Sequence, residues 1–392
     1  MTIASEWYAR NRTRSRALFD LIHPDAYYVR PISLRNPIVF YEGHLPAFSI
    51  ISVLNRGLGR AGVDERLERL FARGIDPESE ETAVPRSGAS TAWPARDEVL
   101  AFGAAADAAL LDAMDTAPSD ALYTALEHEA MHQETLLYMW HRLPYEQKHR
   151  PTYLRYERKG ESPAPKTVRI PAGPATLGAT RDQVPFGWDN EFEAHVVDVA
   201  AFDVDMHSVT NADYLPFVDG GHGEPPAFWH RHDGQWYWRA MFEFVPLPMA
   251  WPVYVSHDAA SAYARWKGRR LMTEAEYHRA ADGTDLAAGH ANFTMWDPVP
   301  AGARPLGTSR WGVHDLVGNG WEWTSTVFAP FPGFEPMATY PEYSADFFDG
   351  EHYVLKGASP ATARELIRPS FRNWFRSNYP YVYAKFRTAG DA

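Results

Sequence analysis

Two histidines lie four residues apart in the stretch LEHEAMHQET (126–135), which is the spacing at which side chains share one face of a helix. His128 and His132 can therefore bind one metal ion together. The alternative is a buried pair that only hydrogen-bonds its neighbours, and for a single histidine that explanation is the more common one. For a pair at this spacing in a helical segment, a metal site is favoured.

A third ligand is expected, because two imidazoles rarely hold a catalytic metal. His44 in FYEGHLPAF is the best candidate, and Pro46, two residues later, disturbs helical hydrogen bonding as residues near shaped sites often do. His23, His141 and His149 are weaker candidates because they fall near the ends of predicted elements. Three histidines suit catalytic zinc as well as iron, so ligand type leaves the metal open.

The same stretch also reads H-E-x-x-H, the pattern in which zinc proteases use the glutamate as general base. Those enzymes pack this helix under a sheet and add a downstream ligand. The flanking sequence here predicts only helices, and Glu129 lies about 100° around the helix from His128. We therefore interpret Glu129 as a buried or pairing carboxylate rather than a catalytic base.

Residues 1–157 are predicted to form an antiparallel four-helix bundle. The expected helices cover 3–21, the stretch from 38 to a stop at 57, 95–116, and a last stretch from Ser119, as N-cap, to Pro144. The stretch 76–94 shows no periodicity, and a long loop of this kind beside a bundle is usually functional or disordered.

Beyond a Pro- and Gly-containing linker at 158–167, residues 168–392 predict an irregular α+β domain. Short β-like runs occur at 167–173, 195–205 and 353–359, and one clear helical pattern covers 256–268. The fold class is therefore α+β with two domains.

Composition narrows the possible partners and the compartment. The 392-residue chain has a net charge of −12 and no long basic run, which argues against nucleic acid and anionic membranes. It has no cysteine, which excludes disulfides, thiolate metal sites and a cysteine nucleophile. We expect a cytoplasmic protein, since no apolar run approaches 18 residues and the N-terminus lacks an apolar leader. The oligomeric state stays open.

The second half resembles the formylglycine-generating-enzyme or sulfatase-modifying-factor fold, a C-type-lectin-like variant. The resemblance is carried by FDVDMHSVTNADYLPFV (202–218), T-E-A-E (273–276) and G-N-G-W-E-W (318–323). Glycines of such motifs permit tight turns, and we interpret Trp321 and Glu322, with Trp323, as structural. The oxidase of that fold holds copper with two cysteines, so a chain without cysteine cannot share its activity.

A DinB-like helical bundle with H-x-x-x-H, joined to this lectin-like domain, resembles the ergothioneine synthase family over nearly the whole chain. Its members are mononuclear iron enzymes that use O₂ to join a chalcogen to C2 of the imidazole of hercynine, a histidine betaine. The resemblance implies that His44, His128 and His132 are ligands of Fe(II), with O₂ as co-substrate.

The resemblance also implies substrate-binding residues in the C-terminal half. SFRNWF (370–375) matches the family's active-site strand, where Asn373 and Trp374 would contact hercynine. Tyr340 and Tyr343 in MATYPEYS match the region of the family's proton donor, and Tyr340 is the preferred candidate. Ordinary loop packing is the alternative for both tyrosines.

Four departures from the family's thiol-using members point to its selenium branch, the selenoneine synthases, which take hercynine and a selenosugar. Trp93 stands where an arginine is expected, Phe375 replaces an aspartate, and Tyr379 stands where a further arginine is common. Met131 replaces a glutamine. Buried charges need partners of opposite sign, whereas aromatic faces suit the C–H face of a sugar.

Three other functions remain in competition. The first keeps the chemistry and uses a thiol donor such as γ-glutamylcysteine, which makes the chain an ergothioneine-type sulfoxide synthase. The second is a zinc hydrolase or thiol transferase built on the DinB-like bundle. The third is a non-enzymatic lectin-like binding module in which alanine at His128 and His132 would leave function intact.

Overall fold

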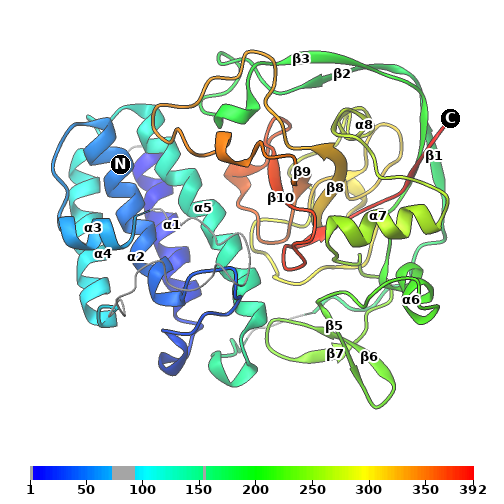
Figure 1. The fold of residues 1–392 in the computed structure, drawn as a ribbon, viewed down its shortest axis with the longest axis horizontal. Helices are drawn as coiled ribbons and strands as arrows, with labels where there is room; N and C mark the ends of the chain where they lie inside the picture. Colours follow the sequence, from blue (N-terminus) through cyan, green and yellow to red (C-terminus); the bar gives the residue numbers. More distant parts are fainter. Residues whose placement is uncertain (1–2, 73–92, 153–155) are drawn as a thin grey trace. The chain divides into compact units, whose positions relative to one another are not determined.

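The structure is a computed structural model that describes residues 3–72, 93–152 and 156–392 (Figure 1). It divides into two compact units. The first contains residues 1–152 together with the short segment Ala338–Tyr340, and the second contains 153–337 and 341–392. The sequence placed the boundary at residue 157 and did not predict that the 338–340 segment belongs with the helices.

The first unit is helical, as predicted. Its elements are α1 (Ile3–Phe19), α2 (Ile38–Ser49), which continues as the π-helix η2 (Ile50–Gly57), α3 (Glu65–Leu70), α4 (Arg96–Ala113) and α5 (Ser119–Arg142). Helix α2 packs on α4 and α5, and α1 packs on α5. The short helix α3 was not predicted; it begins at Asp64, whose side chain accepts a hydrogen bond from the Leu67 amide.

The start of helix α5 differs from the sequence prediction by one residue. Ser119 was expected to be the N-cap of the last helix, but the N-cap is Pro118, whose carbonyl accepts the first helical hydrogen bond from Leu122. Of the predicted loop 76–94, only Trp93 and Pro94 lie within the described residues, so its structure is not tested.

The buried second helix contains Pro46, which removes one helical donor, and the π-helix begins four residues later at Ile50. By length and hydropathy the stretch Ile38–Gly57 could cross a membrane, but 83% of its apolar 18-residue window is buried inside the structure. Burial of this kind is typical of the core helix of a bundle, and His44 lies within it.

The described residues of the second unit form four small sheets, three short α-helices and several 3-10 turns. Its elements are β1 (Thr167–Ile170), β2 (Gly173–Leu177), β3 (His195–Val199), β4 (Phe202–Asp205), α6 (Asn211–Asp219), β5 (Trp229–His232), β6 (Gln235–Arg239), β7 (Phe244–Pro246), α7 (His257–Trp266), α8 (Glu274–Ala280), β8 (Gly320–Val327), β9 (His352–Ala358), β10 (Asn373–Arg376), β11 (Ala384–Lys385) and β12 (Ala389–Asp391). The largest sheet has the order β10-β9-β8-β11, and strand β10 pairs antiparallel with β9.

The G-N-G-W-E-W motif has the structural role that the sequence predicted. Gly320 has φ +126°, and a Cβ there would lie 2.8 Å from the ring of Tyr254, so only glycine fits. Glu322 is buried and bonds Arg387 at 3.0 Å, while Lys385 lies 3.3 Å from its other oxygen. These buried contacts join strand β8 to the C-terminal segment that contains β11.

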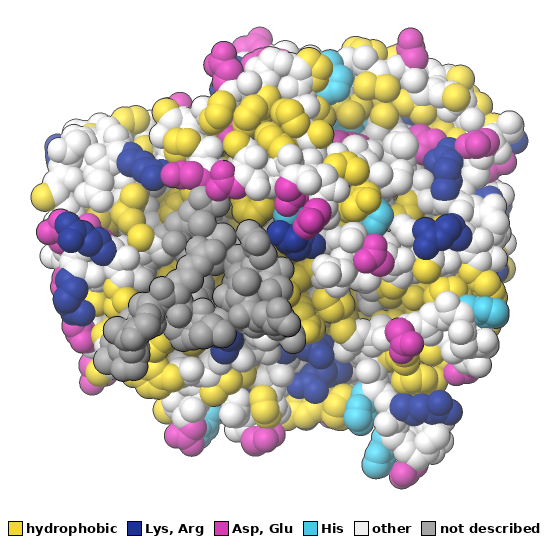
Figure 2. Space-filling model, viewed as in Figure 1, with side chains coloured by type: hydrophobic (Ala, Val, Ile, Leu, Met, Phe, Trp, Pro, Cys, Tyr) yellow, Lys and Arg dark blue, Asp and Glu magenta, His cyan; other side chains and the backbone are white. Residues whose placement is uncertain are grey.

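The surface carries both signs of charge. On the face drawn in Figure 2, Lys and Arg side chains are interspersed with Asp and Glu side chains and with apolar atoms. Charges of both signs are therefore mixed over that face rather than separated into single-sign areas.

Candidate metal centre

Three histidines converge in the first unit. His44 comes from α2, and His128 and His132 come from one face of α5; one ligand atom from each lies within 4.8 Å of the others. The ring of His44 is 5.1 Å from that of His128 and 5.0 Å from that of His132, between centroids. Among the residues that the structure describes, this is the one group of three or more such side chains close enough to share an ion.

The ring of His44 is oriented by the backbone. Its Nδ1 lies 2.8 Å from the carbonyl oxygen of Phe71, just after α3. A carbonyl can only accept, so Nδ1 carries the proton and Nε2 keeps its lone pair for a metal. Burial lowers the pKa of His44 to about 4, so the ring is neutral near pH 7.

The two α5 histidines have the electrostatic properties of metal ligands. Burial, and then the neighbouring imidazoles, hold the pKa values of His128 and His132 well below the ordinary range. Their Nδ1 atoms are buried and have no hydrogen-bond partner among the described residues. Neutral imidazole is the form that binds metals, and unsatisfied buried nitrogens are costly, so the three residues fit a bound cation.

Aromatic rings stack on two of the three histidines, while His132 is half-buried. Phe48 stacks on His128 with ring centroids 3.4 Å apart, and Phe40 stacks on His44 at 5.0 Å. Phe71 in turn stacks on Trp93 at 6.2 Å, so Trp93 lies in the layer behind the histidines. Apolar walls of this kind exclude water, which strengthens electrostatic interactions inside the site.

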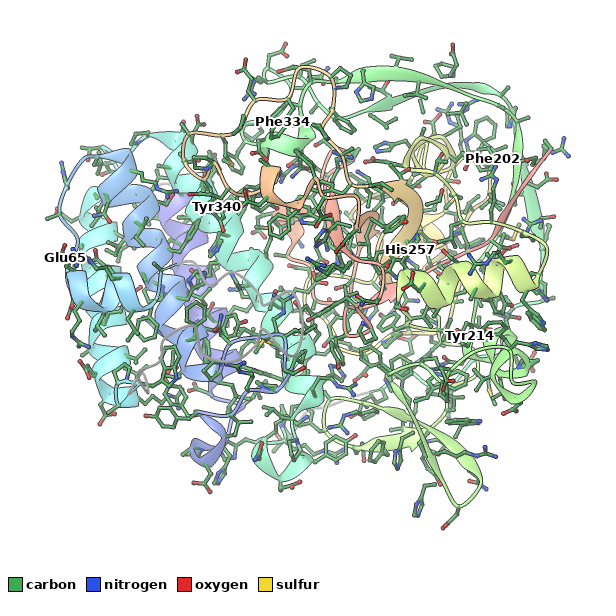
Figure 3. All side chains as sticks on the ribbon, in the orientation of Figure 1. Glu65, Phe202, Tyr214, His257, Phe334 and Tyr340 are labelled. Carbon is green, nitrogen blue, oxygen red and sulfur yellow. The ribbon has the colours of Figure 1, made fainter. Side chains whose placement is uncertain are left out.

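Tyr340 belongs to the same site. Its ring lies 5.1 Å from the ring of Phe48 and 6.2 Å from that of His128, and Figure 3 labels its position. Met131 is half-buried in α5, one residue before His132. Thus the structure brings together six of the predicted site residues in the first unit: His44, Trp93, His128, Met131, His132 and Tyr340.

The other five predicted residues lie in the second unit. Tyr343 stacks on Trp188 at 3.8 Å and meets the edge of Trp374 at 4.9 Å. Phe375 stacks on Tyr379 with centroids 5.3 Å apart. The side chain of Asn373, at the start of β10, accepts a hydrogen bond from the amide of Trp374. The two candidate tyrosines, three residues apart in the chain, therefore belong to different units.

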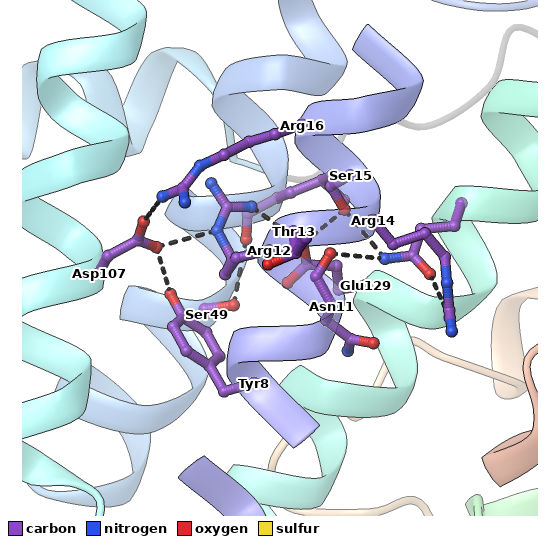
Figure 4. Close-up of polar contacts among 12 residues, drawn as sticks. Tyr8, Asn11, Arg12, Thr13, Arg14, Ser15, Arg16, Ser49, Asp107 and Glu129 are labelled. Carbon is purple, nitrogen blue, oxygen red and sulfur yellow. Dashed lines mark hydrogen bonds and ion pairs between the residues drawn. The ribbon is translucent and has the colours of Figure 1, made fainter. Parts of the chain in front are cut away.

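Glu129 faces away from the histidines, as expected for a pairing carboxylate. Its Oε1 accepts hydrogen bonds from Arg12 Nη1 at 2.9 Å and from Ser15 Oγ at 2.6 Å, both on α1 (Figure 4). Arg12 also donates to Asp107 on α4 at 2.9 Å. This buried network links three helices, so Glu129 stabilises the bundle and has no position from which to act as a protease base.

Replacing Glu129 tests that conclusion. Glu129→Ala leaves the Arg12 charge buried with one partner fewer, and we expect a loss of about 3 kcal/mol in the free energy of unfolding, measured in urea. Glu129→Gln keeps the size and an acceptor, so we expect smaller destabilisation and unchanged turnover. A Gln variant that keeps its stability and metal but loses all turnover would instead make Glu129 a catalytic base.

Sequence reasoning missed several residues of the site. The Phe71 carbonyl is a backbone group, and no side-chain pattern marks it. Phe48 lies four residues after His44, on the same helical face, so helical spacing could have identified it as a neighbour. The contacts of Thr124 with the 338–340 segment join positions 215 residues apart and leave no local signal.

Comparison with known proteins shows which family the chain belongs to. Residues 154–392 match the model of the sulfatase-modifying factor enzyme 1-like domain. The hercynine oxygenase of Mycolicibacterium thermoresistibile is 32% identical, over 98% of this chain and 93% of its own length. The chain belongs to the ergothioneine synthase family. This confirms the predicted membership and the predicted lectin-like second half.

Two further relatives match either nearly the whole chain or somewhat more than half of it. Ergothioneine biosynthesis protein 1 of Schizosaccharomyces pombe is 29% identical over 97% of this chain, which spans 55% of that relative's length. The formylglycine-generating enzyme of Mycobacterium tuberculosis is 29% identical and matches 57% of this chain. Full-length similarity to oxidative enzymes of the ergothioneine synthase family argues against a non-enzymatic lectin-like module.

Proposed function

We propose that this chain is a non-heme Fe(II) enzyme that uses O₂ to join C2 of the hercynine imidazole to the selenium of a selenosugar. The main support for the proposal is the group of three neutral imidazoles that α2 and α5 contribute beside aromatic rings. On this proposal the first unit is a DinB-like bundle, and His44, His128 and His132 are the iron ligands.

Three protein ligands leave other coordination positions open, which is what a catalytic metal site requires. Fe(II) held there would supply the redox chemistry with O₂. Around it, Phe40 and Phe48 would exclude water, and the phenol of Tyr340 would hold the proton that O₂ reduction takes up, to be restored from the C2–H or Se–H group. A side chain that transfers a proton must lie within hydrogen-bond reach of the reacting atoms, and a place beside His128 suits Tyr340 to this role.

Hercynine carries a trimethylammonium group, which aromatic faces attract through cation–π interaction. The C-terminal segment offers several such faces: Trp374, stacked on Phe328 at 4.4 Å, and the stacked pair of Phe375 and Tyr379, with Tyr381 against it. We assign these faces, together with Asn373, to substrate binding.

The two substrates supply all four electrons that O₂ takes up in this reaction, so no other reductant is needed. The C2–H and Se–H bonds break and the C–Se bond forms, which releases two electrons, while O₂ takes up four. Oxidation of selenium supplies the other two, so one oxygen atom leaves on selenium as the selenoxide and the other leaves as water.

Donor identity rests on the aromatic replacements. The stacked pair of Phe375 and Tyr379 presents ring faces where the thiol-using members carry an aspartate and an arginine. Trp93 stacks on Phe71, next to the metal site, where an arginine is expected. A donor with several charges would lose its partners at these positions, whereas the C–H face of a sugar packs well on aromatic rings. These features favour a selenosugar over γ-glutamylcysteine.

The test compares donors on one preparation. The protein is reconstituted with Fe(II) without air and given hercynine and O₂ with a selenosugar, the matching thiosugar or γ-glutamylcysteine. We expect the selenosugar to be used with kcat/KM at least about tenfold above γ-glutamylcysteine, the size of effect that one unpaired buried charge produces. O₂ uptake and product mass are measured.

The thiosugar is the matched control, because it changes selenium to sulfur and keeps the sugar. Equal use of both sugars would mean that the aromatic faces select the sugar and not the chalcogen. Turnover with γ-glutamylcysteine alone would overturn the donor assignment and leave an ergothioneine-type sulfoxide synthase. An iron-loaded protein without O₂ uptake with any donor would favour the zinc hydrolase or thiol transferase.

A further inference from the structure

A segment of three residues brings Tyr340 to the metal site. Ala338–Tyr340 belongs to the helical unit, although the chain on both sides of it belongs to the second unit. Thr339 makes two anchoring contacts there: its hydroxyl lies 2.8 Å from that of Thr124 on α5, and its carbonyl accepts from Arg56 Nη1 at 2.9 Å. The next residue is Tyr340, packed on Phe48 and His128.

The direction of the hydroxyl contact can be assigned. The Thr124 hydroxyl donates its single hydrogen to the carbonyl of Asp120, four residues earlier in α5, at 2.7 Å. It can therefore only accept from Thr339, whose hydroxyl must be the donor. The Thr124 side chain is fully buried and Thr339 is partly buried, so water has limited access to this bond.

The anchor and the metal ligand lie on one helix face. Thr124 precedes His128 by four residues in α5, one helical turn, so their side chains are neighbours. The bond from Thr339 therefore sets the distance between Tyr340 and His128 through rigid helix backbone. Arg56 and Phe48, on η2 and α2, hold the other side of the same segment.

We propose that Thr124 is the positioning residue for Tyr340, acting through its hydrogen bond from Thr339, with Arg56 as a second anchor. This deepens the proposed function, because it rests on Tyr340 as the proton donor. A donor must lie within about 2.6–3.2 Å of its acceptor, and a displacement near 1 Å costs up to about 10²-fold in rate. Thr124 itself touches neither substrate nor metal in this scheme.

The kinetic experiment uses Thr124→Val, which keeps the shape and loses the hydroxyl, and Thr124→Ser, which keeps the hydroxyl. We expect Val to lower kcat about tenfold with KM for hercynine unchanged, and Ser to restore kcat to within about twofold. Combining Thr124→Val with Thr339→Val should cost no more than the worse single change, because both remove one bond. Independent losses that multiply would overturn the pairing.

Thr135→Val is the matched control. Thr135 lies in the same helix and its hydroxyl also donates to the carbonyl four residues earlier, that of Met131, at 3.4 Å. Among the described residues no hydrogen bond joins the Thr135 hydroxyl to the 338–340 segment, so we expect wild-type kcat. An equal loss in Thr124→Val and Thr135→Val would mean that the effect comes from the helix and not from Tyr340.

A second readout does not depend on turnover. The full chain is labelled with 3-fluorotyrosine and loaded with Zn(II), a diamagnetic occupant of the site, and the ¹⁹F signal of Tyr340 is assigned with Tyr340→Phe. In Thr124→Val we expect that signal to move toward the value of an exposed tyrosine, because the ring leaves Phe48 and His128, while Thr135→Val leaves it in place.

The two readouts separate the possible failures. A shifted Tyr340 signal in a protein that turns over no donor keeps the positioning and rejects the proposed function. Wild-type kcat and an unmoved Tyr340 signal in Thr124→Val overturn the positioning, whatever the chemistry proves to be.

Discussion

We expect His132→Ala to lose both the iron binding and the O₂ uptake proposed for this protein. The change removes one of three imidazoles from a site whose nitrogens lie within 4.8 Å of one another, and two ligands rarely hold a catalytic metal. Loss of a partner outside the ligand sphere typically costs about 10–100-fold, so we expect loss of a ligand to cost at least about 10³-fold in turnover. Iron content after anaerobic loading and desalting, and O₂ uptake with hercynine, measure the two effects.

His149→Ala is the matched control for that prediction. His149 is exposed at the end of the helical unit, and its ring lies 5.4 Å from that of His23 rather than at the metal site. It should keep iron and turnover at wild-type values. A His132→Ala protein that turns over without iron would disprove the metal centre, whereas iron retained with turnover lost would leave His132 a catalytic role other than ligation.

We expect Tyr340→Phe to keep the proposed iron binding and to lose most of its turnover. The substitution removes one oxygen atom from a ring that packs on Phe48 and His128, so the packing survives. General acid catalysis typically contributes 10²–10⁴-fold, and we expect kcat to fall by about 10²-fold with the thermal midpoint changed by only a few degrees. Steady-state kinetics with saturating hercynine and O₂ measure the loss.

Tyr343→Phe is the matched control for Tyr340→Phe, because it removes the hydroxyl of the other candidate tyrosine. Tyr343 is stacked on Trp188 in the second unit, and its ring is kept by the substitution. We expect kcat within about threefold of the wild-type value, since only the hydroxyl changes. A large loss in Tyr343→Phe with little change in Tyr340→Phe would reverse the assignment of the proton donor.

Much of the candidate site followed from the sequence because its signals are local. The spacing of His128 and His132 places both rings on one face of any helix, and the helical pattern from residue 119 onward predicted that helix. His44 could be proposed as the third ligand because it lies within a predicted apolar helix rather than near the end of an element. The lectin-like half was predicted by motif, since G-N-G-W-E-W needs glycine at position 320 and a buried pair at Glu322.

Where the sequence fell short, the information was not local. Helix α3 has only six residues, too few to show a period, and the N-cap of α5 moved one residue because the Pro118 carbonyl accepts the first bond. The partners of Glu129 lie on α1, more than a hundred residues away, so its environment depends on how helices pack.

By itself the sequence determined the helical spacing of the candidate ligands, the absence of cysteine chemistry and the family. Only the tertiary structure placed Tyr340 beside His128 and Tyr343 on Trp188, because the two tyrosines lie on an irregular loop whose side chains follow no period. It also decided which nitrogen of His44 keeps its lone pair, through a hydrogen bond to the Phe71 backbone. Both outcomes depend on contacts between distant segments, and such contacts form only when the elements pack.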